Sequence, residues 1–355
     1  MVKQIDTLRS SVVAILQQNH SALSEKVVNK KYEREPHLWE KYGEAGKVHS
    51  LRDVGYHFQF LTEALAMNNT IIFADYVAWV KKLFKGLNLP EVSMQCALEC
   101  IDEVLKEKLS TEQYPIVSPI IEAGFAALNS PLPSISFIDR NAPQGELANA
   151  YNQALLDGDR HAAQKLILDA VEQGVAVKDI YLNVFQKSQY EIGNLWLENK
   201  INVAKEHFCT AATQHIMSQL YPYIFSTQRN GHSFLAANIG GELHEIGIRM
   251  VADFFEMEGW DTFYFGSNTP IDSIIESANE YKVNLIGLSI TLPTHISLLK
   301  DAVEKIRKGT SPSTKIIIGG FALNREGIPI NQFKADGYAP NATLAVTLGN
   351  QLIRS

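Results

Sequence analysis

The chain has 355 residues, of which 46% are hydrophobic and 20% are charged, a composition typical of a soluble protein with two or three globular domains. Its formal net charge of −7, with no dense cluster of Lys and Arg, argues against a protein that binds nucleic acid directly. Its three cysteines make no disulfide framework, and no apolar stretch has the length of a membrane span or a signal peptide, so we expect a cytoplasmic protein without a membrane partner.

Residues 1–128 are predicted to fold into an all-helical domain. Apolar residues recur at helical spacing at 58–65, 72–83 and 98–109, and turn-forming residues separate these stretches. Residues 129–145 hold three prolines and show no regular pattern, which indicates a linker.

The pattern changes twice more along the chain. Residues 146–230 form a second helical block, and over residues 231–355 short apolar runs alternate with helical segments. We expect strands at 234–240, 262–266, 284–290 and 315–319, and helices at 245–258, 271–281 and 295–308. Such alternation implies a parallel sheet with helices on both faces, a fold that binds ligands beyond the carboxyl ends of its strands.

Residues capable of binding a metal or of approaching a ligand closely follow three of these strands. They are Glu242, His244 and Gly247 after the first strand, Ser289 and Thr291 after the third, and Gly319 and Gly320 after the fourth. His244 lies on a loop where its imidazole can meet a metal, and Glu242 could accept the other ring N–H. A glycine pair lets the backbone approach a ligand closely.

These residues resemble the motif of the cobalamin-binding Rossmann-like (flavodoxin-like) domain, in which Asp/Glu-x-His-x-x-Gly, Ser-x-Thr/Leu and Gly-Gly follow the strands. The resemblance implies that His244 is the protein's ligand to cobalt and displaces the dimethylbenzimidazole tail, which inserts beside the first helix. It also implies that Glu242, Gly247, Ser289, Thr291, Gly319 and Gly320 contact the cofactor. Glu242 stands where an aspartate is commoner.

The second helical block holds Trp196, Val203, Glu206 and His207. In a continuous helix Trp196, Val203 and His207 share one face, whereas a break at residues 199–202 would put these side chains at a helix–helix corner. A buried tryptophan and a core histidine are the ordinary explanation. The pattern also resembles the helical cap of light-sensing cobalamin repressors, which implies that the four residues surround the 5′-deoxyadenosyl group of adenosylcobalamin. Leu197 stands where those repressors have a second histidine, so their bis-histidine photoproduct is not expected.

The segments Arg52–Phe58 and Phe73–Trp79 resemble a helical domain of photocobilins, photoreceptors that pair a cobalamin with a bilin. The resemblance implies a bilin such as biliverdin near Arg52 and His57, bound noncovalently because no cysteine precedes Cys96. An aromatic pocket with a few cations and polar groups suits a linear tetrapyrrole. The alternative is an ordinary helix-bundle core that serves dimerisation or partner docking.

Together these resemblances predict an adenosylcobalamin photoreceptor rather than an enzyme. Light-driven cleavage of the cobalt–carbon bond would change the cap and thereby association in a homo-oligomer, expected to be a dimer, or binding to a downstream protein. A corrinoid methyl carrier of a methyltransferase system is the alternative, and it needs an open upper face. A mutase is excluded, because the pattern holds no barrel domain.

Overall fold

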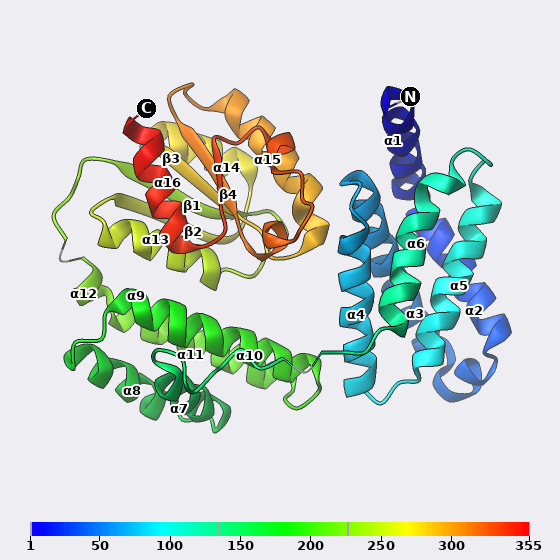
Figure 1. Ribbon diagram of the computed structural model, residues 1–355, viewed down its shortest axis with the longest axis horizontal. Helices are drawn as coiled ribbons and strands as arrows, with labels where there is room; N and C mark the ends of the chain where they lie inside the picture. Colours follow the sequence, from blue (N-terminus) through cyan, green and yellow to red (C-terminus); the bar gives the residue numbers. More distant parts are fainter. Residues whose placement is uncertain (1, 134, 226, 355) are drawn as a thin grey trace. The chain divides into compact units, whose positions relative to one another are not determined.

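The computed structural model describes residues 2–133, 135–225 and 227–354, so residues 1, 134, 226 and 355 of the predicted domains and linker lie outside it. Contacts divide the chain into two units (Figure 1). One comprises Met1–Leu132 with Arg325–Pro329, and the other comprises Pro133–Asn324 with Ile330–Ser355. We name the first the helical unit. No helix of the described residues is long and apolar enough to cross a bilayer.

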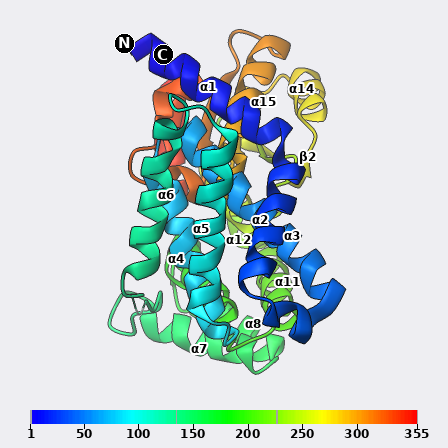
Figure 2. The same ribbon diagram turned by 90° about the vertical axis from the view of Figure 1, so that its right-hand side faces the viewer.

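The helical unit confirms the expected helical N-terminal region (Figure 2). Asn69 accepts a hydrogen bond from the Ile71 N–H and so caps the helix that begins at Thr70. Phe58, Leu61 and Leu98, which belong to the apolar stripes predicted from the sequence, are fully buried. The helices are α1 (Val2–Gln18), α2 (His20–Arg34), α3 (His37–Ala66), α4 (Thr70–Gly86), α5 (Glu91–Lys108) and α6 (Tyr114–Asn129).

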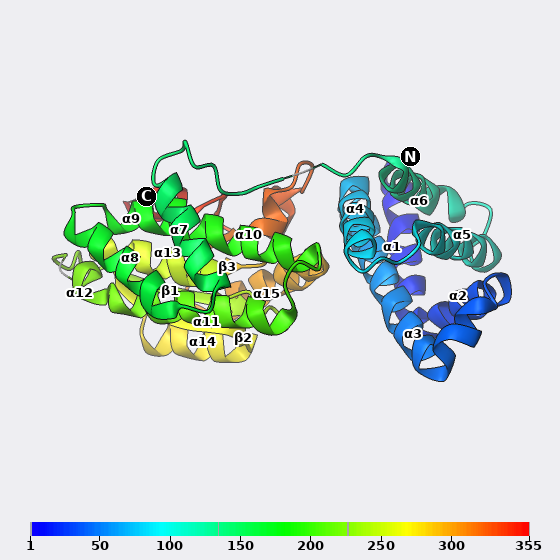
Figure 3. The ribbon, with the colours of Figure 1, turned by 90° about the horizontal axis from the view of Figure 1, so that it is seen from below.

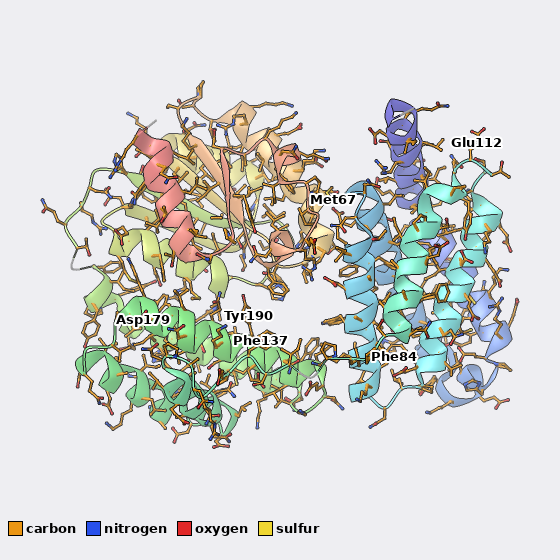
Figure 4. The ribbon with its side chains drawn as sticks, viewed as in Figure 1. Met67, Phe84, Glu112, Phe137, Asp179 and Tyr190 are labelled. Atoms are coloured by element: carbon orange, nitrogen blue, oxygen red, sulfur yellow. The ribbon has the colours of Figure 1, made fainter. Side chains whose placement is uncertain are left out.

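The second unit begins with a layer of helices, which we name the cap. Phe137, which precedes it, packs its ring against Tyr190 at a centroid distance of 5.4 Å (Figure 4). The Phe137 N–H also donates to the Glu191 carboxylate, so this part of the predicted linker lies against the cap. The cap comprises α7 (Gly145–Leu156), α8 (Arg160–Glu172), α9 (Val177–Asp179), η1 (Ile180–Phe185), α10 (Gln186–Leu197), α11 (Val203–Gln219) and α12 (Tyr221–Ile224).

A five-stranded parallel sheet in the order β2-β1-β3-β4-β5 follows the cap and confirms the predicted fold class. Helices α13 and α16 pack on one face, and α14 and α15 pack on the other. The elements are β1 (Ser233–Ile239), α13 (Ile246–Met257), β2 (Asp261–Thr269), α14 (Ile271–Glu280), β3 (Leu285–Ser289), η2 (Pro293–His295), α15 (Ile296–Gly309), β4 (Lys315–Gly319), η3 (Phe321–Asn324), η4 (Ile330–Phe333), β5 (Gly337–Ala339) and α16 (Ala342–Arg354).

The cap and the sheet domain share one hydrophobic core (Figure 3). Tyr181 and Phe185 of the cap and Phe254 and Phe255 of α13 are all buried in it. The Tyr181 hydroxyl donates to the carboxylate of Asp253 over 2.8 Å. The loop before α13 is therefore held at a fixed place relative to the cap, because both belong to one packed unit.

Asp253, on α13, makes the stability of this core depend on pH. Burial raises the pKa of its carboxyl from an ordinary 3.8 to about 6, against the opposing effects of the Tyr181 hydroxyl and the Arg249 guanidinium. The pKa of Asp253 is higher in the folded chain than in the unfolded chain, so the folded chain binds the proton more tightly. Protonation of Asp253 therefore stabilises the fold fully below pH 3.8, and this stabilisation is lost as the pH rises through about 6.

We therefore expect Asp253→Asn to stabilise the protein in a pH-dependent way. Asparagine keeps an acceptor for Tyr181 without a charge, so the free energy of unfolding should rise by roughly 3 kcal/mol at pH 8 and by much less at pH 4.5. Urea denaturation at the two pH values measures this difference. An equal gain at both values would show that the charge of Asp253 has no part in it.

Candidate functional site

The strands end in register at one edge of the sheet. Asn238 of β1 is paired with Ser289 of β3, which is paired in turn with Gly319 of β4. The structure therefore brings together at this edge the residues that the sequence singled out after three different strands. The loop of Glu242 and His244 leaves the same edge, because it directly follows β1.

The carboxylate of Glu242 is the centre of the hydrogen bonding at this edge. Its side chain has no exposed surface. Oε1 accepts from Nδ1 of His244 over 2.6 Å and from the His244 backbone N–H over 3.1 Å. Oε2 accepts from the backbone N–H groups of Thr291 and Leu292 over 2.7 and 3.1 Å, and lies 3.0 Å from Nδ1 of His295. One buried carboxylate thus joins the loop after β1 to the loop after β3.

These bonds determine which nitrogen of His244 can bind a metal. Burial by itself would raise the pKa of Glu242, but the donors from His244, His295 and the backbone outweigh it and lower that pKa well below its ordinary range. An ionised carboxylate only accepts, so Nδ1–H of His244 donates, and in the neutral ring the lone pair is then on Nε2. The His244 side chain is 56% exposed. Its Nε2 is therefore available as a ligand atom.

The backbone around His244 is fixed by residues that the sequence motif does not contain. Nδ2 of Asn238 donates to the His244 carbonyl over 3.0 Å. Asn268, at the end of β2, accepts from the Gly241 N–H and donates its own N–H to the Glu242 carbonyl. The prediction from the sequence also did not include His295. Its place on the loop after β3 was the signal that could have indicated it, since that loop was already expected at the ligand edge.

Two different structural features explain the glycines of the motif. Gly320 has a φ of +102°, and a Cβ there would come within 2.2 Å of the Ile290 carbonyl oxygen. Only glycine fits that turn. A Cβ on Gly247 would meet no atom within 4 Å. The start of α13 therefore has room beside it for a ligand.

The predicted cap residues lie at a helix–helix corner. Trp196 is near the end of α10 and Val203 begins α11, so the continuous helix considered from the sequence is broken, as the alternative expected. The Asn202 side chain accepts from the Lys205 N–H and starts the new helix there. Val203 is 51% exposed, so its side chain is on the surface of the cap.

Glu206 connects this corner to the interior of the cap. Its carboxylate accepts from Nδ1 of His207 over 2.6 Å, and the side chain of His207 is 74% exposed. Glu206 is also in contact with the Thr210 hydroxyl, which bonds to Gln189.

The cap and the sheet edge influence each other electrostatically. The hydrogen bond to Glu242 is the main cause that raises the pKa of His244, burial opposes it, and the charge of Glu206 adds to the rise. A carboxylate of the cap therefore lies within electrostatic reach of the imidazole on the sheet edge.

Arg52 and His57, on α3 of the helical unit, have different surroundings. The Arg52 side chain is 61% exposed, and its Nε lies 3.7 Å from the Asp53 carboxylate. His57 is buried, its Nδ1 lies 2.7 Å from the Tyr76 hydroxyl, and burial lowers its pKa to about 3. His57 is therefore a neutral residue of the helix-bundle core.

An aromatic stack leads from this core to the surface of the helical unit. The ring of Tyr76 lies 3.9 Å from that of Phe60 and 6.4 Å from that of Trp79, in stacked arrangements. Trp79 is 41% exposed and Tyr56 is 48% exposed. Flat apolar surface therefore lies on the two segments that the sequence related to a bilin-binding domain.

The residues at the sheet edge fit a cobalamin. A buried acceptor, Oδ1 of Asn238, has no hydrogen-bond partner among the described residues, although such atoms are normally paired. Gly247 leaves space beside α13, and His244 directs Nδ1 to Glu242, so that Nε2 of the neutral ring is the nitrogen left for a metal. A metal ligand, open space beside α13 and an unpaired polar atom at one edge suit a large polar cofactor with a central metal.

Comparison with known families agrees with this fit. Residues 232–346 match the family model described as B12 binding domain, and residues 147–221 match a second model with the same description. Residues 3–128 match the model described as phycobilisome protein.

Curated relatives resemble the chain over part of its length. A corrinoid protein of Desulfitobacterium hafniense is 23% identical over 212 residues, which are 58% of this chain and 97% of that protein. Dimethylamine corrinoid protein 3 of Methanosarcina mazei is 26% identical over 166 residues, 46% of this chain and 96% of that protein. Both match along almost their entire length.

A solved structure has the same fold. The monomethylamine corrinoid protein of Methanosarcina barkeri superposes with a TM-score of 0.52 and 20% sequence identity, over 59% of this chain and 100% of that one. Matches to corrinoid proteins agree with the expectation of a binding protein rather than an enzyme.

Proposed function

We propose that this chain binds a cobalamin and carries a methyl group for a methyltransferase. The observation that supports this function best is that corrinoid proteins match the chain along 97% and 96% of their own length. A bound cobalamin would supply a cobalt centre that can accept and give up a methyl group. This is the alternative that the sequence left open.

In this proposal each residue of the site has a separate task. His244 binds the metal through Nε2, and Glu242 holds the ring by the bond to Nδ1. Gly247, Ser289, Gly319 and Gly320 line the path of the nucleotide tail, and Thr291 fixes Glu242 through its N–H. Trp196, Val203, Glu206 and His207 face the carbon group. The exposure of Val203 and His207 supports access by a partner protein.

Substitution of Trp196 separates a methyl carrier from a sensor of the adenosyl form. For a carrier, we expect methylcobalamin to bind the full chain at least as tightly as adenosylcobalamin, and Trp196→Ala to weaken both to the same small extent. For a sensor, Trp196→Ala should weaken adenosylcobalamin about tenfold and spare hydroxocobalamin, because only the adenosyl group would stack on the indole. Titrations followed by absorption measure the three affinities. Selective loss of the adenosyl form would contradict the carrier.

The second candidate is the photoreceptor that the sequence first predicted, in which an adenosylcobalamin and a bilin sense light. One observation favours it specifically, namely the match of residues 3–128 to a phycobilisome protein. The relatives cover only 58% and 46% of the chain, so a large part has no counterpart in them. Arg52 and the aromatic stack ending at Trp79 offer a cation and flat apolar surface to a tetrapyrrole. The nearest cysteines, Cys96 and Cys100, are buried, which supports noncovalent binding.

Co-expression with a source of biliverdin tests this candidate. A photoreceptor should absorb red light after desalting and release the pigment in acidified organic solvent. Arg52→Glu should weaken pigment retention about tenfold, because a propionate would lose its cation. Lys85→Glu, on the exposed end of α4, makes the same charge change as a control.

Size-exclusion chromatography before and after green light tests the expected homodimer. Absence of red absorbance with excess biliverdin would leave the helical unit as a dimerisation or docking module.

A further inference from the structure

Gln189 of α10 forms hydrogen bonds to two threonines of α11 through the two ends of its side-chain amide. Its Nε2 donates to the Thr213 hydroxyl over 2.9 Å, and its Oε1 lies 3.1 Å from the Thr210 hydroxyl, which can donate to it. The two threonines are three residues apart, so they lie on one face of α11. One side chain thus joins α10 to α11 at two points, and we name this pair of hydrogen bonds the Gln189 clamp.

The threonines do not need Gln189 as a hydrogen-bond partner. Thr213 is fully buried, and its Oγ1 lies 2.8 Å from the hydroxyl of Tyr151 on α7. Tyr151 is fully buried as well, which makes Thr213 a fixed point of the cap core. The Thr210 hydroxyl lies 3.1 Å from Oε1 of Glu206 and can donate its one hydrogen there. The clamp therefore adds a connection between two helices, and the threonines would be paired without it.

The clamped face of α11 also carries two of the residues predicted at the cap corner. This face repeats at spacings of three, four and three residues, the pattern of one side of a helix, through Val203, Glu206, Thr210 and Thr213. The Thr210 hydroxyl contacts both Gln189 and Glu206, so a single side chain separates the clamp from this carboxylate. The position of Glu206 relative to α10 therefore depends on the clamp.

We infer that Gln189 is a positioning residue that fixes Glu206 at the cap corner and thereby limits the size of the carbon group that the cap accepts. The short corner joins α10 to α11 at one end, and the clamp joins them along their length, so α11 is held close to α10. A methyl group then fits beside Glu206, whereas a longer alkyl group has to displace α11. This inference rests on the proposed function, in which Glu206 faces the carbon group on cobalt.

Cobalamins whose upper group differs in size test the inference in the full chain. Titrations in the dark, followed by absorption, give the affinities for hydroxocobalamin, methylcobalamin and propylcobalamin. Gln189→Met keeps a side chain of similar length that suits a helix, and it removes both bonds of the clamp. Gln153→Met, on the exposed side of α7, is the matched control, because it makes the same exchange and removes a hydrogen bond to Asp157 instead. Gln189→Ala replaces the methionine variant if that one does not fold.

The parent chain is expected to bind methylcobalamin about tenfold more tightly than propylcobalamin. Gln189→Met should remove most of this preference, because without the two hydrogen bonds α11 can move away from α10. Its affinity for hydroxocobalamin, whose upper group is the smallest, should stay within about twofold of the parent value, which a damaged fold would not allow. Gln153→Met should keep the preference of the parent chain.

An unchanged preference in Gln189→Met, or an equal loss of affinity for all three cobalamins, overturns the inference alone. A parent chain that binds methylcobalamin and propylcobalamin equally also overturns it, since the cap then does not select the carbon group by size. A parent chain that binds adenosylcobalamin more tightly than methylcobalamin contradicts both the methyl carrier and the inference.

Discussion

Substitution of His244 by alanine is expected to weaken cobalamin binding more than about 100-fold, since even residues that only orient a metal ligand contribute 10- to 100-fold. The loss follows from the position of the imidazole, whose Nδ1 donates to Glu242 and whose Nε2 is free. Any cofactor that still binds should keep its own benzimidazole on the metal. Titration with hydroxocobalamin and the paramagnetic spectrum of the reduced form measure both effects.

A matched control is His161→Ala, which removes an exposed imidazole from α8 of the same unit. It should bind cobalamin like the parent chain. Thermal unfolding should be nearly unchanged in His244→Ala, because the ring is 56% exposed and the loop is also fixed by Asn238 and Asn268. A His244→Ala variant with the affinity and the unchanged paramagnetic spectrum of the parent chain would refute the ligand assignment.

The sequence predicted the sheet edge because parallel strands carry their following loops to one side. Three βα loops could therefore be combined without knowledge of any contact. The last strand and helix, β5 and α16, were not predicted. β5 has three residues and its Gly337 and Tyr338 are only partly buried, so it shows neither an apolar run nor a clear alternation.

Side-chain partners could not be predicted from the same patterns. His295 and Asn268 are far from Glu242 along the chain, and only the folded loops bring them to it. The burial of His57 has the same origin, because the Tyr76 hydroxyl that bonds to it comes from another helix. Helical periodicity assigns a residue to one face of its helix, but it does not show which polar group of a neighbouring element contacts that face.

Glu242→Leu is expected to lower the free energy of unfolding by about 3 to 5 kcal/mol, the usual cost of removing one partner from a buried charged network. The leucine leaves the N–H groups of Thr291 and Leu292 without an acceptor, together with those of two imidazoles. Urea denaturation of the cofactor-free chain measures the loss. Glu256→Leu, at a carboxylate of the same domain that is 4% exposed, measures the cost of removing a buried carboxylate away from the site.

Replacement of Glu242 by aspartate, the commoner residue at this position of the motif, separates its two tasks, which are to hold His244 and to bind the loop after β3. Glu242→Asp shortens the side chain by one methylene, so one carboxylate can no longer reach both His244 and the loop after β3. We expect it to keep the bond to His244 and to bind cobalamin within about tenfold of the parent chain. It should still lose roughly 1 to 3 kcal/mol of stability, because the N–H groups of Thr291 and Leu292 lose their acceptor. An aspartate variant that loses cofactor affinity but no stability would mean that Glu242 serves His244 alone.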